Sequence, residues 1–327
     1  MKAIIPVAGI GERLRPFTHT TPKPLLSLAG KPILAHIIDN LLPKGIDELV
    51  IVVGHLGEQI EQFVRSRYDI PIDIVWQDDL RGLGYAVSLA LNKVADNEPV
   101  LLILGDTIVE ADISQVLGLK EHTIGITRVG NPRRFGVVEL SGKRIIGMEE
   151  KPDNPKSNYA IAGLYYFTGV SCLRKHLKKL VDNDVRTKGE IQLTDALKEM
   201  LAENEIFNSF KIEGWFDCGK TDALLETHRH LLENNSNIAE MAKNIVVPPV
   251  YVSPNALVEN SILGPYVSIG ENAMIKNAIL SNTIVGDRAV LNHCILEDSI
   301  LGNDSAFSGR AYRLNLGDSS KVELEWE

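Results

Sequence analysis

The chain has 327 residues and 44% hydrophobic content, enough for one large domain with a sizeable core and a smaller second domain. Its formal net charge of −9 argues against nucleic acid as a partner, because nucleic-acid-binding proteins present large basic surfaces. No apolar run is long enough to span a bilayer and the N-terminus shows no signal-peptide pattern, so we expect a cytoplasmic protein without a membrane partner.

The cysteines give little indication of chemistry. Cys172, Cys218 and Cys294 are scattered along the chain without CxxC spacing. This pattern argues against a disulfide framework and against a structural zinc site, and it fits a reducing compartment.

The N-terminal segment combines a strand with a glycine loop. The apolar run Ala3–Val7 is too short for a helix and predicts a buried parallel strand. Ala8, Gly9 and Gly11 follow at its C-terminal end, where open α/β sheets bind ligands and where glycine lets backbone N–H groups approach an anion. Basic side chains outnumber acidic ones in residues 1–31 by five to one, which favours a phosphate ligand; the five are Lys2, Arg13, Arg15, Lys23 and Lys31.

The glycine loop alone is a weak signal. It lacks the third glycine of a dinucleotide fingerprint and the Gly-Lys-Ser/Thr ending of a P-loop, so a plain turn is an equal alternative. Lys23 adds to it, because Pro22 and Pro24 on either side predict a stiff extended loop that aims the ammonium at one phosphate.

From residue 32 to about residue 109 the pattern alternates between helix and strand. Such alternation predicts βαβ crossovers and a Rossmann-like, mostly parallel sheet. The expected helices and strands are, in order, a helix from Pro32 to Leu42, strand Leu49–Val53, helix Glu58–Ser66, strand Ile72–Trp76, helix Tyr85–Val94 and strand Val100–Leu104.

Two of these strands end in polar residues that suit a nucleotide site. Gln77 follows the strand Ile72–Trp76, and its amide can pair with a pyrimidine edge; Gly82 lies in the glycine-rich turn after it. Asp106 follows Gly105 after the next strand and can hold Mg²⁺ on substrate phosphates. A glycine-rich turn and an ordinary turn aspartate are the alternatives for these segments.

The pattern becomes rich in strands between Thr123 and Phe167, as expected of an insertion that covers an α/β site. Glu150 and Lys151 lie side by side there and offer a carboxylate that accepts hydrogen bonds and a cation that can meet phosphate. An ordinary exposed charge pair is the alternative. Gly189 and Glu190 open an expected helix that reaches about Ala202.

The C-terminal part begins after a second aspartate. Asp217 lies in a short aromatic-Asp-x-Gly segment, and the helix Asp222–Leu232 follows. The polar residues 233–237 mark a domain boundary, so we expect a catalytic domain over residues 1–237 and a second domain over 238–327.

The second domain contains a repeat of sixteen residues: the stretch from Asn277 realigns with the stretch from His293, and aliphatic residues recur every six positions. Short strands at this spacing resemble the left-handed β-helix of hexapeptide-repeat proteins, with three to four coils. We expect it to serve assembly into a homo-oligomer.

The motifs together resemble one family, the sugar-1-phosphate nucleotidylyltransferases. The resemblance rests on the run Val7–Pro16, on Pro22-Lys23-Pro24-Leu25, on residues 81–86 and on the segments listed here: Phe135–Val138, Glu149–Pro152, Ala162–Tyr165, Gly189–Asp195 and Trp215–Gly219. It covers nearly the whole chain, and the tail from Tyr312 is similar to that of the long-form glucose-1-phosphate thymidylyltransferases. Ala8, in place of a glycine common in thymidylyl members, is similar to the uridylyl branch.

This resemblance implies transfer of a nucleotidyl group from dTTP or UTP to glucose 1-phosphate or a related hexose 1-phosphate, with release of pyrophosphate. Arg13 would stabilise pyrophosphate, Lys23 the α-phosphate and Lys151 the sugar phosphate. The implied nucleotide-binding residues are Ala8, Gly9, Gly11, Gln77, Gly82 and Asp106; the implied sugar-binding residues are Gly136, Glu150, Lys151, Gly163 and Glu190. Asp106 and Asp217 would bind Mg²⁺.

Three alternatives remain. UTP-glucose-1-phosphate uridylyl transfer is the first. The second adds an acyltransferase activity in the β-helix, for which His293 is the histidine inside the repeat, although we favour a structural β-helix. The third, a nucleotide-sugar sensor, would have no need of Asp106, Asp217 and Lys151.

Overall fold

The computed structural model describes residues 1–235, 241, 243–309 and 314–323. These residues form two compact units, which we describe one at a time. The first unit comprises residues 1–9 and 37–215, and the second comprises the described residues of 10–36 and 216–327. The domain boundary predicted between residues 237 and 238 lies outside the described residues and stays a prediction.

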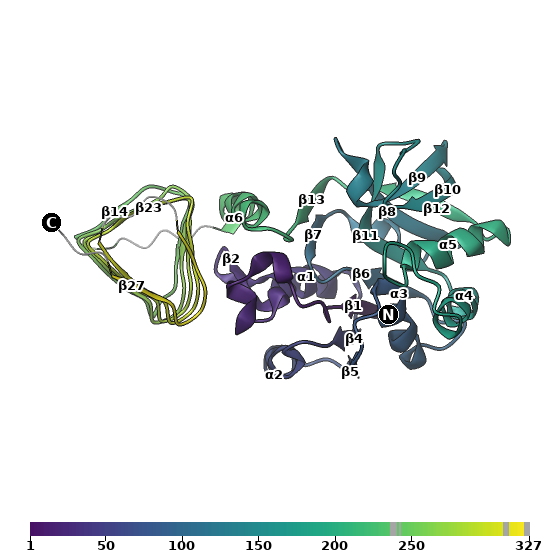
Figure 1. The fold of residues 1–327 in the computed structure, drawn as a ribbon, viewed down its shortest axis with the longest axis horizontal. Coiled ribbons are helices and arrows are strands. Elements are labelled where there is room, and N and C mark those ends of the chain that lie inside the picture. The colour runs from purple at the N-terminus through teal and green to yellow at the C-terminus, as the bar shows by residue number, and fades with distance from the viewer. Residues whose placement is uncertain (236–240, 242, 310–313, 324–327) are drawn as a thin grey trace. The chain divides into compact units, whose positions relative to one another are not determined.

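A nine-stranded sheet is the centre of the first unit (Figure 1). From one edge to the other its strands are β5 (Ile72–Trp76), β4 (Glu48–Val53), β1 (Lys2–Pro6), β6 (Val100–Ile103), β11 (Tyr159–Phe167), β8 (His122–Arg128), β12 (Phe207–Lys211), β10 (Arg144–Glu150) and β9 (Gly136–Ser141).

The direction of the strands changes along this sheet. The four strands from β5 to β6 are parallel, as predicted, and Ile4 of β1 aligns with Val50 on one side and Leu102 on the other. β11 runs antiparallel to both β6 and β8, β12 is parallel to β8, and β9 and β10 form an antiparallel pair. The predicted α/β class is confirmed, and the antiparallel strands come from the strand-rich insertion.

Helices cover the sheet because their apolar faces need burial. The helices are α1 (Ile33–Leu41), α2 (Gly57–Arg67), α3 (Leu83–Ala90), α4 (Ser171–Asp182), α5 (Leu193–Ala202) and α6 (Thr221–Asn235). In the first unit α3 packs against β1 and β4 and also against α4 and α5, whereas α2 packs against β4 and β5. The sequence analysis did not predict α4 or β12.

Short elements complete the connections. The remaining strands before the C-terminal part are β2 (Ser27–Leu28), β3 (Lys31–Pro32), β7 (Thr107–Glu110) and β13 (Gly214–Asp217). Single turns of 3₁₀ helix lie at Glu12–Leu14, Phe17–His19, Lys23–Leu25, Leu42–Lys44, Leu91–Lys93, Ile113–Gln115 and Pro132–Arg134.

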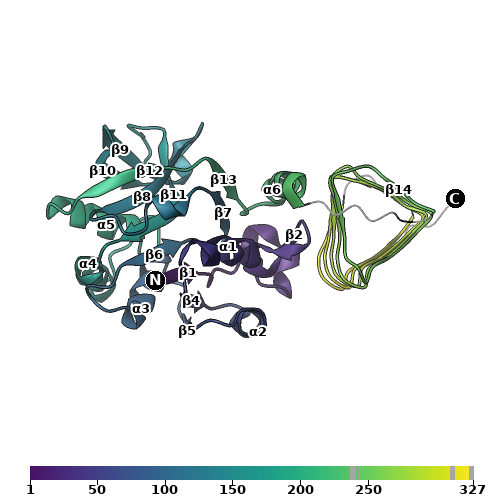
Figure 2. The same ribbon diagram turned by 180° about the vertical axis from the view of Figure 1, so that it is seen from behind.

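The second unit contains the predicted β-helix, whose coils project as a triangle in Figures 1 and 2. Its strands are β14 (Ile245–Val246), β15 (Val250–Val252), β16 (Leu257–Glu259), β17 (Ile262–Leu263), β18 (Val267–Ile269), β19 (Met274–Lys276), β20 (Ile279–Ser281), β21 (Thr283–Val285), β22 (Val290–Asn292), β23 (Ile295–Glu297), β24 (Ile300–Leu301), β25 (Ala306–Ser308), β26 (Asn315–Leu316) and β27 (Lys321–Glu323). They form three parallel sheets, β14-β17-β20-β23, β15-β18-β21-β24-β26 and β16-β19-β22-β25-β27.

Two features of the sequence produce these coils. Leu263, Leu280 and Leu296 align strand to strand and are fully buried, so three successive coils each place one leucine in a continuous core ladder. The corners require left-handed backbone, which asparagine and aspartate tolerate best; Asn277 at φ 52° and Asp304 at φ 56° are examples. The predicted β-helix fold is confirmed, with four complete coils and two strands of a fifth among the described residues.

None of the helices among the described residues combines the length and the apolar character needed to cross a membrane.

Candidate active site

The first residues of the loop after β1, Val7 to Gly9, lie in the first unit. Val7 N donates to Val52 O at 2.8 Å, which keeps the loop in line with β4. Ala8 is buried, and its methyl group packs on Gly54, where a Cβ would come within 3.0 Å of it. A Cβ on Gly9 would meet no atom of the described residues within 4 Å, so among them this residue borders open space of the kind a ligand needs.

Gln77 lies directly after β5, as predicted, and it is buried. Its backbone N donates to Val53 O at 2.8 Å, and its side-chain Nε2 donates to Asp79 O at 2.9 Å. The amide plane is therefore fixed before any ligand arrives, which favours recognition of a planar ring edge.

The predicted nucleotide and sugar segments meet at Gly82. Gly82 has φ +105°, and a Cβ there would lie 2.7 Å from Glu190 Cβ and 2.8 Å from Ile191 O. Backbone bonds tie the two segments together: Ile191 N donates to Arg81 O at 2.7 Å, and Gly84 N donates to Ile191 O at 2.8 Å. Only glycine at position 82 permits this approach.

One expectation for this segment was wrong. Glu190 does not open a helix, since α5 begins at Leu193. Thr187 and Glu190 form an isolated antiparallel bridge instead, and the Glu190 carboxylate accepts a bond of 3.1 Å from Gln192 Nε2. The bridge holds Glu190 in an exposed turn beside Gly82.

Asp106 lies half-buried two residues after Leu104, at the C-terminal end of β6. Thr107 Oγ1 donates to its Oδ1 at 3.2 Å. The neighbouring β11 bulges at Gly163, which has φ +79° and whose carbonyl accepts from Leu104 N at 2.9 Å. The structure thus brings Gly163 next to the strand end that carries Asp106.

The predicted sugar-phosphate residues form a cluster around Glu150. Thr194 Oγ1 donates to Glu150 Oε2 at 2.7 Å, and Lys151 Nζ lies 3.5 Å from Glu150 Oε1. Gly136 faces the same carboxylate, because a Cβ there would lie 3.0 Å from both Glu150 Oε2 and Thr194 Oγ1. Burial and the charge of Glu150 raise the pKa of nearby Tyr165 well above its usual range.

Thr194 is a member of this cluster that the sequence analysis did not select. Its side chain is buried at the start of α5 and orients a carboxylate that is only 9% exposed. In the sequence, the signal that could have identified Thr194 was its position inside the motif Gly189–Asp195, three residues after Ile191.

In the second unit, Gly11 and Lys23 pack together. Gly11 has φ +73°, and a Cβ there would lie 3.0 Å from Thr18 Cγ2 and 3.1 Å from Lys23 Cβ. The predicted extended conformation of Lys23 was wrong: Lys23–Leu25 form one turn of 3₁₀ helix, in which Leu26 N donates to Lys23 O at 3.1 Å. Lys23 is only 7% exposed, so its stem is firmly packed.

Arg13 and Asp217 approach one another in the second unit. A Cβ on Gly219 would lie 2.8 Å from Asp217 Oδ1 and 3.0 Å from Arg13 Nη2. Gly219 therefore leaves room for a guanidinium and a carboxylate side by side at the end of β13. The aromatic-Asp-x-Gly segment contained this glycine, but its role depends on Arg13, which is about two hundred residues away in the sequence.

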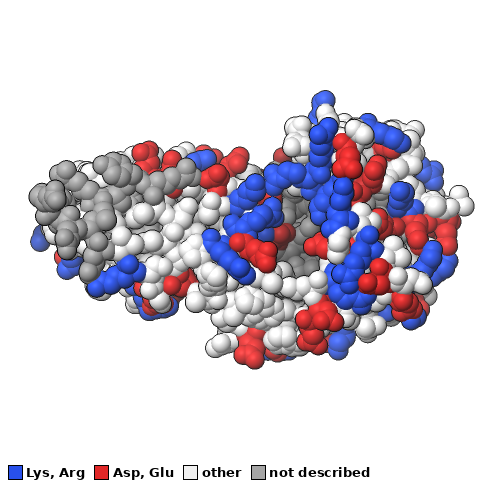
Figure 3. Space-filling view, viewed as in Figure 1, with Lys and Arg blue, Asp and Glu red and all other residues white. Residues whose placement is uncertain are grey.

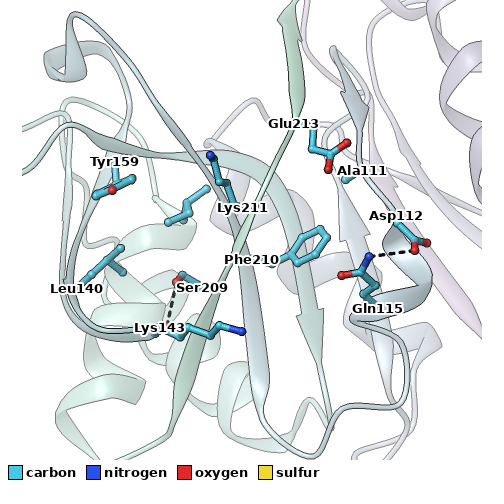
Figure 4. Close-up of a pocket in the computed structure, with 11 residues that line it drawn as sticks. Ala111, Asp112, Gln115, Leu140, Lys143, Tyr159, Ser209, Phe210, Lys211 and Glu213 are labelled. Carbon is cyan, nitrogen blue, oxygen red and sulfur yellow. Dashed lines mark hydrogen bonds between the residues drawn. The ribbon is translucent and has the colours of Figure 1, made fainter.

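A pocket of about 390 Å³ lies elsewhere on the first unit (Figure 4). Lys143 and Lys211 line it together with Tyr159, Asp112 and Glu213. None of the predicted site residues is among its lining residues. On the face drawn in Figure 3, Lys and Arg side chains gather in the middle of the view, and Asp and Glu side chains lie among and beside them.

The family follows from a comparison with known proteins. The family model described as nucleotidyl transferase matches residues 2–234, so the chain belongs to the nucleotidyl transferase family. The family resemblance expected from the motifs is confirmed.

Individual relatives are similar to this chain over different shares of its length. The bifunctional protein GlmU of Methanocaldococcus jannaschii is 36% identical over 251 residues, which cover 76% of this chain and 59% of that relative. A glucose-1-phosphate thymidylyltransferase of Streptomyces antibioticus is 29% identical over 361 residues, covering 99% of this chain and 100% of the relative. The crystal structure of a UDP-glucose pyrophosphorylase complexed with UDP-glucose superposes with a TM-score of 0.63 at 25% identity, over 71% of this chain and 98% of that one.

Proposed function

We propose that the protein transfers a nucleotidyl group from dTTP or UTP to glucose 1-phosphate or a related hexose 1-phosphate and releases pyrophosphate. The observation that carries this proposal furthest is the packing of Gly82 on Glu190, which joins the predicted base-reading turn to the predicted sugar-binding segment. The pyrophosphorylase crystallised with UDP-glucose and the thymidylyltransferase relative support the same substrate classes.

The nucleotide would be held by backbone and amide groups. Gln77 would read the pyrimidine edge with an amide already oriented by Asp79 O. Ala8, Gly9, Gly11 and Gly82 would let the backbone approach the triphosphate closely.

The sugar 1-phosphate would be held around Glu150. Its carboxylate, oriented by Thr194, would accept hydrogen bonds from sugar hydroxyls, and Lys151 would meet the sugar phosphate. Gly136, Gly163 and Glu190 would complete this part of the site.

The chemical step needs no nucleophile from the protein. An oxygen of the sugar phosphate attacks the α-phosphorus in line, the bond to the β-phosphate bridging oxygen breaks, and pyrophosphate leaves with the electron pair. Arg13 would stabilise the charge that grows on pyrophosphate, and Lys23 would contact the α-phosphate.

Asp106 and Asp217 fit the donor set of a magnesium ion. Both are half-buried carboxylates near strand ends, and Gly219 leaves space at the Asp217 carboxylate. When bound, Mg²⁺ would neutralise triphosphate charge, while Asp106 and Asp217 would hold it.

The remaining expectations belong to the same proposal. We propose residues 1–237 as the catalytic domain, residues 238–327 as a β-helix that mediates homo-oligomerisation, and a cytoplasmic location where nucleoside triphosphates are made.

A substrate panel tests the proposed reaction. Full-length protein is incubated with Mg²⁺, one of five nucleoside triphosphates and one of several hexose 1-phosphates, and pyrophosphate release is measured. We expect release with dTTP or UTP and a glucose-type 1-phosphate, and none without the sugar phosphate. Absence of release in every combination would refute the proposal.

A further inference from the structure

A second group of metal-ligating side chains lies on helices α4 and α5 of the first unit, which pack side by side (Figure 1). Cys172 and His176 are four residues apart on α4 and therefore share one face of that helix. Glu203 is the C-cap residue of α5. One ligand atom from each of these three side chains lies within 4.8 Å of the other two.

His176 has the environment of a metal ligand. Its Nδ1 lies 2.8 Å from Glu199 Oε2, a hydrogen bond that fixes the orientation of the ring. Its Nε2 is buried and makes no hydrogen bond to any described residue, although it lies 3.2 Å from Glu203 Oε2. A histidine that is bonded to a carboxylate through one nitrogen presents the other to a metal in many metalloproteins.

The distances suit a tetrahedral ion. Zinc binds nitrogen and oxygen at about 2.0–2.2 Å and sulfur at about 2.3 Å, so adjacent ligand atoms lie about 3.3–3.7 Å apart. His176 Nε2 and Glu203 Oε2 lie 3.2 Å apart, close to that separation. The ligand atom of Cys172 lies within 4.8 Å of the ligand atoms of the other two side chains, so it would have to move closer on metal binding. The carboxylate of Glu205 lies beside Cys172 and offers a fourth ligand, or water completes the shell.

We propose that Cys172, His176 and Glu203 form a zinc-binding site that clips α4 to α5. The mixed sulfur, nitrogen and oxygen donors favour Zn²⁺ over Mg²⁺, which prefers oxygen alone. The site is distinct from the proposed magnesium carboxylates Asp106 and Asp217. The sequence analysis argued against a structural zinc site because the cysteines are scattered without CxxC spacing. The pair Cys172 and His176 becomes informative only when the fold brings Glu203 beside it.

Lys175 is the natural competitor of the metal. Its Nζ lies 2.8 and 2.7 Å from the two oxygens of Glu203, and its side chain is 62% exposed. An exposed ammonium can swing away, but it lowers the affinity of the carboxylate for a second cation. Removing this lysine should therefore tighten metal binding.

Cobalt substitution tests the proposal, because a thiolate bound to Co²⁺ gives a charge-transfer absorption that oxygen and nitrogen ligands do not give. Chelator-treated full-length protein is titrated with CoCl₂ and then with ZnCl₂. We expect about one equivalent of Co²⁺ to produce the band and Zn²⁺ to displace it. Cys294→Ser, which changes a buried cysteine of the β-helix, should leave the band intact.

Variants assign the ligands. Cys172→Ser should abolish the band, and His176→Gln should weaken Zn²⁺ binding by about a hundredfold. Glu199→Gln, which changes only the residue that orients His176, should weaken it about tenfold. Lys175→Met should strengthen it, a gain that misfolding cannot mimic.

Thermal unfolding gives a second measurement. Zn²⁺ should raise the Tm of the wild-type protein and leave that of Cys172→Ser unchanged, because only a ligand of the native state stabilises it. A band that survives Cys172→Ser, the absence of any thiolate band, or equal Zn²⁺ affinity in wild type and His176→Gln would overturn the proposal.

Discussion

At the scale of single residues, the clearest requirement for one particular amino acid is the requirement for glycine at position 82. Its φ of +105° strains any side chain, and a Cβ would press on Glu190 Cβ and Ile191 O. We expect Gly82→Ala to reduce kcat/KM for both substrates by at least about tenfold, because the two substrate segments are forced apart. Steady-state kinetics with each substrate varied in turn measure this.

Gly142→Ala is the matched control for Gly82→Ala. Gly142 also has positive φ, at +63°, but a Cβ there would meet no atom within 4 Å in the part of the chain that the structure describes. Its alanine variant should lose stability from backbone strain while keeping its kinetic constants. Equal kinetic losses in the two variants would show that strain, and not the contact with Glu190, causes the effect.

The buried side chain of His228 allows a prediction of how the free energy of unfolding depends on pH. Burial lowers the pKa of His228 to about 3, and its Nδ1 accepts a hydrogen bond of 3.1 Å from Ala29 N in the same unit. Because the folded pKa is below the unfolded value of about 6.5, stability is complete above pH 6.5 and falls as the pH drops toward 3. Between pH 7.5 and pH 5 we expect a loss of about 2 kcal/mol from this group.

Denaturant unfolding at the two pH values measures this dependence. His228→Gln removes the titrating ring and should lose about 2 kcal/mol less than wild type over the same range. His293→Gln, which changes an exposed histidine at a β-helix corner, is the control and should follow wild type. The same His293 variant should keep full nucleotidyl transfer. The pH prediction fails when His228→Gln shows the wild-type slope.

At the scale of elements, the last coil of the β-helix contacts the segment from Pro16 to Thr21 within the second unit. The hydroxyls of Thr20 and Thr21 donate to the carboxylate of Asp318. A Cβ on Gly317 would lie 2.8 Å from Pro16 Cβ, so glycine allows the two backbones to pack closely. From the sequence we expected the β-helix to serve only assembly. These contacts indicate a second role, in which the β-helix supports the loop between Arg13 and Lys23.

Replacing both threonines tests this support. Thr20→Val with Thr21→Val removes two hydrogen bonds to a charged group and leaves Asp318 bonded to Asn303 N at 2.8 Å. We expect turnover to fall about tenfold because the loop that carries Arg13 loses its anchor. Asp304→Ala, which breaks the ion pair with Arg288 inside the β-helix, should leave turnover unchanged. Unchanged turnover in the double variant would show that these contacts do not support the loop, and it would leave assembly as the role of the β-helix.

Elements with a strong local pattern could be predicted from the sequence. β1, α1 and the β-helix repeat each follow from residues close together in the chain. The sequence analysis did not select α4, although its buried residues recur at helical spacing: Leu173, His176, Leu177 and Leu180. The polar His176 makes this stripe less apolar than that of an ordinary core helix. β12 was missed because its pairing partner is distant: Phe207 aligns with His122 of β8.

The residues of the candidate site divide in the same way, into those that a local sequence pattern predicted and those whose contacts join distant segments. Gln77 and Asp106 lie directly after strands, where the sequence predicted them, although their roles remain predictions. The contacts of Gly82 with Glu190 and of Gly219 with Arg13 join residues far apart in the chain, and no local pattern encodes them. The 3₁₀ turn at Lys23 shows that flanking prolines allow a single helical turn when proline occupies its second position.

At the scale of the whole molecule, the first sheet of the β-helix carries a ladder of outward isoleucines. Ile245, Ile262, Ile279 and Ile295 align strand to strand, and three of them are 59%, 43% and 54% exposed in the order Ile245, Ile279 and Ile295. A straight aliphatic stripe matches a second copy of itself across a twofold axis, which buries it on both chains. We therefore expect a homo-oligomer built on this stripe.

Charge on the ladder should separate the subunits. Ile279→Glu with Ile295→Glu places two carboxylates in the expected interface, where burial without a partner opposes association. Light scattering after size exclusion should show the oligomer of the wild type and a smaller species for the variant. Ser308→Glu adds a charge at an exposed position on another sheet and should leave the mass unchanged. A wild-type monomer would refute the expected homo-oligomer. An oligomer that persists in the double variant would place the interface elsewhere, because two opposed pairs of buried carboxylates outweigh the apolar area that this stripe offers.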